Sequence, residues 1–260
     1  MGMGTRELSV EGRLHEVTIQ CRRGLVTAIC GPNGAGKSTL LSCLADLQPV
    51  TSGSVRLGGR PMAFSSPRER ARWLGYLPQS PEVAWDVAVE VLVSLGRLPW
   101  SDAPAGENAQ AIEDAIAAMD LEELRHRPVS RLSGGERARA LMARVLATRP
   151  GWLLADEPLA SLDLGHGAAL MRRFRQQAQQ GRGVVLVLHD LATAMNHADH
   201  VVVLDKGRVV AEGVPEVALT QELISRVWKC RARWLGDPGE RALSVASPSP
   251  VMERGLRPLD

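Results

Sequence analysis

Hydrophobic residues follow two patterns along this chain, and their alternation predicts the architecture. Short, continuous apolar runs at 25–30, 152–155 and 184–188 are typical of parallel strands that are covered on both faces. Other segments carry apolar residues at helical spacing, as at 39–47 and 136–146. Strands that alternate with helices in this way predict an α/β protein with a parallel sheet.

Two regions depart from this alternation. Residues 5–30 alternate loosely between apolar and polar positions, which predicts strands that enter the core. From residue 86 to about residue 124 the strand pattern gives way to helical spacing, so a helical insert is predicted within the α/β protein.

The last part of the chain combines three patterns. Residues 201–212 predict a hairpin around the turn Asp205-Lys206-Gly207. Helical segments extend from there to about Trp228. Pro, Gly, Ser and Arg dominate after Gly236, which predicts an irregular tail over 236–260.

A glycine-rich run lies between the strand at 25–30 and the helix at 39–47. It fits the pattern G-x-x-x-x-G-K-[ST], in which backbone N–H groups cradle phosphates, Lys37 reaches the outer phosphates and the Ser38 hydroxyl ligates Mg²⁺. The positive end of the following helix adds to the anion site. An ordinary glycine-rich turn is the alternative, and the flanking strand and helix argue against it. The predicted nucleotide-binding residues are Gly31, Pro32, Asn33, Gly34, Ala35, Gly36, Lys37, Ser38 and Thr39.

Polar side chains follow three of the predicted strands. Ligands of open α/β sheets lie beyond the carboxyl ends of the strands. Asp156 is therefore placed to hold Mg²⁺, and Glu157 to orient and polarise an attacking water. His189 can bond the γ-phosphate or this water, and Gln79 can contact Mg²⁺ and water. The alternative for Asp156 and Glu157 is a pair of acids that caps the strand end, and the alternative for His189 is a structural role.

A second glycine-rich segment lies at Ser133-Gly134-Gly135-Glu136. It is a capping box, so Ser133 and the two glycines present N–H and hydroxyl groups at a positive helix end. The alternative is an ordinary helix start. This loop cannot serve the same phosphate tail from within the same fold. The pair of loops therefore predicts a chain that closes over ATP as half of a dimer.

Composition narrows the function classes. A net charge of +2, with 23% charged residues, gives no broad electrostatic case for a nucleic-acid partner. The four cysteines are scattered without a C-x-x-C pair, which argues against a disulfide framework or a zinc site. No secretory signal and no apolar run near 18 residues are seen, so the chain is not expected to span a membrane by itself.

Over nearly all of residues 5–228, the segments resemble the ATP-binding-cassette family in family order. They are Walker A (31–38), the Q-loop Gln79, the signature (132–136), Walker B with Asp156 and Glu157, the D-loop Ser161-Leu162-Asp163 and the switch His189. The resemblance implies a RecA-like P-loop NTPase core with an N-terminal antiparallel β lobe and a helical subdomain. The implied division is 1–85, the first part of the core with the β lobe; 86–131, the helical subdomain; 132–235, the second part of the core; and 236–260, the tail.

The family mechanism follows as an implication of this resemblance. Two cassettes pair head to tail, and the signature residues Ser133, Gly134 and Gly135 of each cover the ATP of the other. Glu157 is the general base, His189 stabilises the γ-phosphate and Asp163 links the two sites. Ser38, Gln79 and Asp156 hold Mg²⁺. One departure from the family concerns adenine binding. The family usually has an aromatic residue that stacks on adenine, but the segment 8–27 contains none. Arg13 and His15 stay open as substitutes.

The subfamily is indicated by Leu95-Gly96-Arg97-Leu98-Pro99-Trp100, which resembles the "LGR-x-P" element of importer cassettes for ferric siderophores, haem and cobalamin. This likeness implies a homodimer on the cytoplasmic face of the inner membrane. It also implies integral-membrane permease subunits, an extracytoplasmic substrate-binding protein and no nucleic acid. The cargo stays open between the three.

Three other classes of protein share part of this pattern. Exporter cassettes are often fused to a membrane domain, which this sequence does not show. Soluble cassette ATPases that act on DNA or ribosomes usually carry a coiled-coil insert, zinc-binding cysteines or two cassettes. A nucleoside-phosphate kinase would share the phosphate loop but would not need 132–136 or His189.

Overall fold

The computed structural model of the protein describes residues 2–62, 64, 66–79, 86–160 and 162–246. Its centre is a six-stranded sheet with the order β10-β9-β3-β8-β7-β6, in which only the edge strand β10 runs antiparallel to its neighbour. The strands are β3 (Val26–Cys30), β6 (Leu74–Leu77), β7 (Trp152–Asp156), β8 (Gly183–Val187), β9 (His200–Asp205) and β10 (Arg208–Gly213). The predicted parallel sheet is confirmed.

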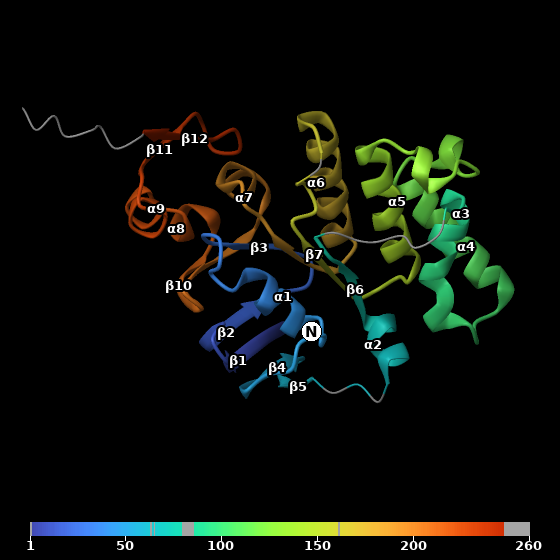
Figure 1. The fold of residues 1–260 in the computed structure, drawn as a ribbon, viewed down its shortest axis with the longest axis horizontal. Helices are drawn as coiled ribbons and strands as arrows, with labels where there is room; N and C mark the ends of the chain where they lie inside the picture. Colours follow the sequence, from blue (N-terminus) through green and yellow to red (C-terminus); the bar gives the residue numbers. More distant parts are fainter. Residues whose placement is uncertain (1, 63, 65, 80–85, 161, 247–260) are drawn as a thin grey trace, which may run out of the picture.

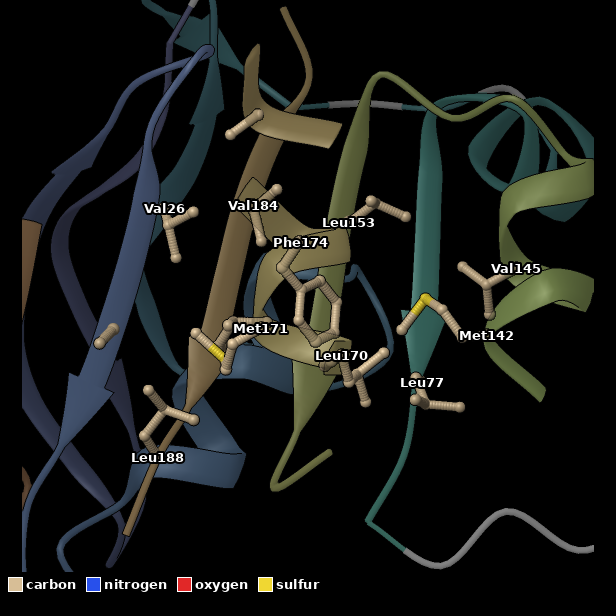
Figure 2. Packing of buried hydrophobic residues seen from close by; sticks show 14 of the residues in the cluster. Val26, Leu77, Met142, Val145, Leu153, Leu170, Met171, Phe174, Val184 and Leu188 are labelled. Atoms are coloured by element: carbon tan, nitrogen blue, oxygen red, sulfur yellow. The ribbon is translucent and has the colours of Figure 1, made fainter. Parts of the chain in front are cut away.

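The three central strands are buried along their whole length, because helices cover both faces of the sheet (Figure 1). On one face lie α6 (Leu164–Gln179) and α7 (Leu191–His197). Phe174 and Met171 of α6 pack there against the strand residues Val184 and Leu153 (Figure 2). The continuous apolar runs therefore divide between two cores, since successive strand residues point to opposite faces.

The second core joins the central sheet to a smaller sheet. This β lobe has the order β2-β1-β4-β5 and is antiparallel throughout. Its strands are β1 (Met3–Val10), β2 (Leu14–Cys21), β4 (Ser52–Leu57) and β5 (Arg60–Pro61). Between the two sheets lies α1 (Lys37–Leu44), whose Leu40, Leu41 and Leu44 are buried against both (Figure 1). The predicted N-terminal antiparallel β lobe is confirmed.

Residues 86–131 contain helices and no β-strand. With the flanking segments, the helical elements are α2 (Pro67–Trp73), α3 (Val89–Ser94), η1 (Leu95–Trp100), α4 (Ala105–Ala118), η2 (Glu122–Leu124), η3 (Val129–Arg131) and α5 (Gly134–Ala147). Figure 1 shows α3, α4 and α5 side by side at one end of the molecule. Within the part of the chain that the structure describes, no helix combines the length and the apolar character that a membrane crossing needs.

The LGRLPW segment is η1, and it fastens the helical region to the core. Arg97 is buried and donates to the carbonyl oxygen of Ala147 at 2.9 Å. Trp100 donates from its indole N–H to the carbonyl oxygen of Thr148 at 2.9 Å. The guanidinium carbon of Arg72 lies 4.5 Å from the centroid of the Trp100 ring, and that of Arg97 lies 5.2 Å from it. Two cations on one indole therefore tie α2, η1 and the end of α5 together.

The chain continues through α8 (Pro215–Ala218), α9 (Gln221–Trp228), β11 (Arg231–Leu235) and β12 (Ala242–Ala246). The prediction of an irregular tail over 236–260 is wrong at 242–246, because β12 pairs antiparallel with β11. Asn196 of α7 fixes this hairpin by exchanging two hydrogen bonds with the backbone of Arg241. These tertiary contacts, rather than local pattern, stabilise the strand. Residues 247–260 of the predicted tail lie outside the described part.

The packing of Trp152 gives a test of the central sheet. A Cβ atom on Gly183 would lie 2.6 Å from Cδ2 of the buried Trp152 ring. We expect Gly183→Ala to lower the free energy of unfolding by about 1–3 kcal/mol, because the core must shift to admit a methyl group. Urea unfolding measures the effect. The control is Gly106→Ala in α4, where a Cβ meets nothing within 4 Å. Equal stability of Gly183→Ala and the wild type would contradict the described packing.

Candidate functional site

A cavity of about 610 Å³ opens at the carboxyl end of β3. It brings the phosphate loop together with three polar side chains from later in the chain. The lining residues are Arg13, Asn33, Gly34, Ala35, Gly36, Lys37, Ser38, Thr39, Gln79, Glu157 and His189. The sequence analysis predicted all of these as site residues except Arg13, which stayed open as a contact of the adenine base.

The phosphate loop is pressed between the core and the β lobe. A Cβ on Gly31 would overlap the carbonyl oxygen of Leu204 at the end of β9. A Cβ on Gly36 would lie 2.9 Å from the carbonyl oxygen of Arg13. Both glycines have positive φ, 153° and 98°. Only glycine combines this backbone conformation with such a close approach, so the loop is held open toward the cavity.

Lys37 is the cation of the site and is only 5% exposed. Its Nζ donates to the carbonyl oxygens of Gly31 at 2.9 Å and of Pro32 at 3.0 Å. Burial lowers the pKa of Lys37, and the neighbouring carboxylate of Glu157 opposes the shift. A buried ammonium whose partners are neutral carbonyls is well placed to accept an anion instead.

Asp156 ends β7 and is 4% exposed. Burial raises the pKa of its carboxyl group, and a hydrogen bond with Ser38 opposes that shift. Its Oδ1 has no hydrogen-bond partner among the described residues. An unsatisfied carboxylate oxygen beside a hydroxyl fits a hard divalent cation such as Mg²⁺. Among the described residues, no group of three or more His, Cys, Asp or Glu side chains is arranged to hold a metal ion. The Ser38 hydroxyl beside Asp156 is an oxygen ligand of the kind that Mg²⁺ prefers.

Glu157 is the centre of the polar cluster. It has φ of 49°, an uncommon value for a residue with a side chain, and its N–H donates to the carbonyl oxygen of Val187 at 3.2 Å. Gln79 donates from Nε2 to Oε2 of Glu157 at 2.6 Å, and Nε2 of His189 contacts Oε1 of Glu157. The three residues follow the adjacent strands β6, β7 and β8. A carboxylate held in this way can take a proton from a water in the cavity.

The signature residues lie away from the phosphate-loop cavity. Ser133 and Glu136 form the predicted capping box: the Ser133 N–H donates to Oε2 of Glu136 at 2.8 Å, and the Glu136 N–H to Oγ of Ser133 at 3.3 Å. Gly134 lines a different hollow of about 320 Å³, which borders Gln79 and Glu157. The two hollows share Gln79 and Glu157, and Ser133, Gly134 and Gly135 are not among the described residues that line the phosphate-loop cavity. That this loop serves another nucleotide stays a prediction.

Asp163 of the D-loop is linked to the signature of its own chain through His166. Asp163 caps α6 by accepting a hydrogen bond from the His166 N–H at 2.8 Å, and its other carboxylate oxygen lies 2.8 Å from Nδ1 of His166. The His166 ring in turn covers Gly135, where an added Cβ would lie 3.0 Å from it. Asp163 is therefore outside the cavity of its own chain. Ser161, also predicted in this loop, lies outside the described residues.

Two features around the phosphate loop could not be assigned from the sequence. Of the two substitutes for the missing aromatic, Arg13 lines the cavity and His15 is not among the described lining residues. A further hollow of about 380 Å³ shares Asn33, Gly34 and Ala35 with the cavity, and Trp228 is among its other lining residues. Trp228 lies far along the sequence, so only the tertiary structure brings it to the loop.

A family model described as ABC transporter matches residues 14–160. The chain belongs to the ABC transporter family. As a member of this family, it is an ATP-binding and ATP-hydrolysing subunit. Curated relatives are similar to this chain over most of their length. The hemin import ATP-binding protein HmuV of Streptomyces coelicolor is 46% identical, over 89% of this chain and 83% of the relative. HmuV of Rhodococcus jostii is 44% identical, over 83% and 74%.

Solved structures support the cassette fold. CbiO1 of Clostridium perfringens, part of the ABC transporter complex cbiONQ, is 27% identical with a TM-score of 0.77, over 86% of this cassette and 92% of that chain. An inward-facing ABC transporter assigned to the metal-chelate type gives a TM-score of 0.81 at 22% identity, over 95% and 97%. At that identity the likeness is one of fold. The roles of the individual site residues stay predictions.

Proposed function

We propose that this cassette hydrolyses ATP to drive an importer of metal chelates, with haemin as the cargo. The observation that carries the proposal is the cluster of Gln79, Glu157 and His189 at the phosphate-loop cavity. It occurs in a chain that is 40–46% identical to several proteins named for haemin import. The cluster supports hydrolysis, and the relatives support the cargo.

ATP occupies the cavity with its phosphates on the loop 31–38. Backbone N–H groups and Lys37 hold the outer phosphates, and Arg13 at the cavity wall takes the place of the missing aromatic against the base. Mg²⁺, when bound, neutralises phosphate charge, and the residues that fit it are Ser38, Asp156 and Gln79.

Hydrolysis requires a positioned water and a base. Glu157 removes a proton from the water as its oxygen attacks the γ-phosphorus, and the bond to the β–γ bridging oxygen breaks to give ADP and phosphate. Gln79 and Nε2 of His189 hold the Glu157 carboxylate in place until ATP binds. This Nε2 then leaves Glu157 and donates to the γ-phosphate. The base that accepts the proton is therefore positioned before the substrate arrives.

The active unit is a homodimer of cassettes. The signature residues Ser133, Gly134 and Gly135 do not line the phosphate-loop cavity of their own chain. In a head-to-tail pair they cover the nucleotide of the partner, with the N–H groups at the start of α5 directed at its phosphates. Asp163, packed beside the signature, links the two sites.

Glu157→Gln tests whether Glu157 is the general base of hydrolysis. We expect at least about a 100-fold loss of ATP turnover, because the amide cannot accept the proton, with ATP affinity retained. Phosphate release and equilibrium nucleotide binding measure the two effects. The matched control is Glu123→Gln on the exposed part of η2, which should turn over normally. Turnover by Glu157→Gln within a few-fold of the wild type would remove Glu157 as the base.

The permease docks on the helical side of the cassette. A hollow of about 340 Å³ lies between α2, β6, η1 and α5, and its walls are largely apolar. Leu98 at its rim is 66% exposed. A short helix of a permease subunit would cover this surface and hold the cassette at the cytoplasmic face of the inner membrane. The permease would in turn receive cargo from an extracytoplasmic substrate-binding protein.

Leu98→Glu tests this docking surface. A carboxylate at the rim must be desolvated on docking, so at least about tenfold less permease should copurify from detergent-solubilised membranes. ATPase activity of the isolated cassette should not change. Val217→Glu is the control, since Val217 is 63% exposed on α8, on the opposite side of the core. Equal recovery of permease with both variants would exclude this surface.

The cargo is tested with the purified complex of cassette and permease, reconstituted in vesicles with ATP enclosed on the cassette side and the substrate-binding protein added outside. We expect ATP-dependent transport of haemin and none with Glu157→Gln. Ferric siderophore and cobalamin are the competing cargoes. Transport of either of these without haemin would overturn the cargo assignment and leave the ATPase assignment standing.

A further inference from the structure

Leu164 is an apolar residue whose side chain is exposed to solvent. It is 95% exposed, against 66% for Leu98, the next most exposed large hydrophobic residue among those described. It is the first residue of α6. The N-cap of this helix is Asp163, so Leu164 has no part in capping the helix.

The position of Leu164 is fixed relative to the signature. Asp163 holds both the N–H and the ring of His166, and the ring lies against Gly135. Leu164 therefore projects from the same end of the molecule as the signature loop. An exposed leucine by itself is ordinary, so its meaning depends on a complementary surface elsewhere on the chain.

Such a surface lies beside the phosphate loop. The hollow of about 380 Å³ is lined by the loop residues 32–35, by the β9–β10 turn and by the end of α9. Its apolar walls are Pro32, Val227 and Trp228, and its volume is several times the roughly 30 Å³ that one water occupies. The charged residues Asp205, Lys206 and Lys229 also line it. An uncharged apolar side chain suits the walls.

We propose that Leu164 of one cassette inserts into the hollow beside Trp228 of a second copy when the pair closes. The inference rests on the head-to-tail pairing proposed above, which brings the signature end of one chain to the phosphate loop of the other. A two-fold pair makes every such contact twice, so a single chain must carry both the projecting side chain and the hollow. This chain carries both.

The contact also links pairing to nucleotide. Pro32 forms part of the hollow, and its carbonyl oxygen accepts a hydrogen bond from Lys37 at 3.0 Å. The Lys37 contact and the hollow therefore share Pro32, so the loop that binds ATP also forms part of the contact with the partner's Leu164.

The test measures association in the Glu157→Gln background, where ATP is bound but not hydrolysed. Leu164→Ala should weaken ATP-dependent dimerisation, followed by light scattering, by about tenfold or more, because the buried side chain is lost from both contacts. Val217→Ala on α8 is the control for loss of an exposed apolar side chain and should dimerise normally. Unchanged dimerisation of Leu164→Ala would overturn the contact and leave the proposed function intact.

A direct measurement places the two residues together. Chains with Leu164→Cys and chains with Trp228→Cys are mixed, both also carrying Glu157→Gln and Cys230→Ser so that the neighbouring thiol is removed. Oxidation should give a disulfide between unlike chains with ATP and none without it. If Glu157→Gln alone forms no dimer with ATP, the pairing itself fails. If Leu164→Ala dimerises normally but loses the permease, the surface belongs to the permease instead.

Discussion

The site depends on the register of four parallel strands. Strand β8 lies between β3 and β7, and Val185 pairs with Thr27 on one side and Leu154 on the other. This register ends the strands at one edge and brings the phosphate loop, Glu157 and His189 to the same cavity. Two loop hydrogen bonds extend it: Leu188 donates to Ile29, and Glu157 to Val187. A shift by one residue would turn each side chain to the opposite face, and the polar cluster would be lost.

Burial on both faces is what holds that register. Residues of β8 alternate between the two cores, with Val184 and Leu186 facing α6 and Val185 and Val187 facing α1. The apolar pattern is therefore not only a sign of a buried strand, because it excludes any slip that would expose one face. Polar chemistry is confined to the points where the strands stop.

Much of this arrangement could be predicted from the sequence. The phosphate loop and the polar residues after β7 and β8 carry local signals, a glycine pattern and apolar runs that end in charge. Other contacts have no local signal. Lys37 folding back on Gly31 and Pro32, His166 covering Gly135 and Asn196 holding the hairpin at Arg241 join residues whose spacing predicts nothing. Strand β12 was missed for this reason, and so was Trp228 beside the loop. In the sequence the LGRLPW segment is only a likeness to importer cassettes, whereas in the structure its Arg97 and Trp100 form a stack with Arg72 of α2.

The strand order also governs when the site can form. Residues 26–30 pair only with strands at 183–187 and 200–205, and Gly31 lies against the carbonyl of Leu204. As the chain is synthesised from its amino end, the phosphate loop emerges while both of these strands are still untranslated. Contacts of such long sequence separation form slowly. The nascent amino-terminal half thus holds a complete nucleotide-binding motif that cannot yet take its binding shape, and ATP can stabilise the protein only after β9 is made.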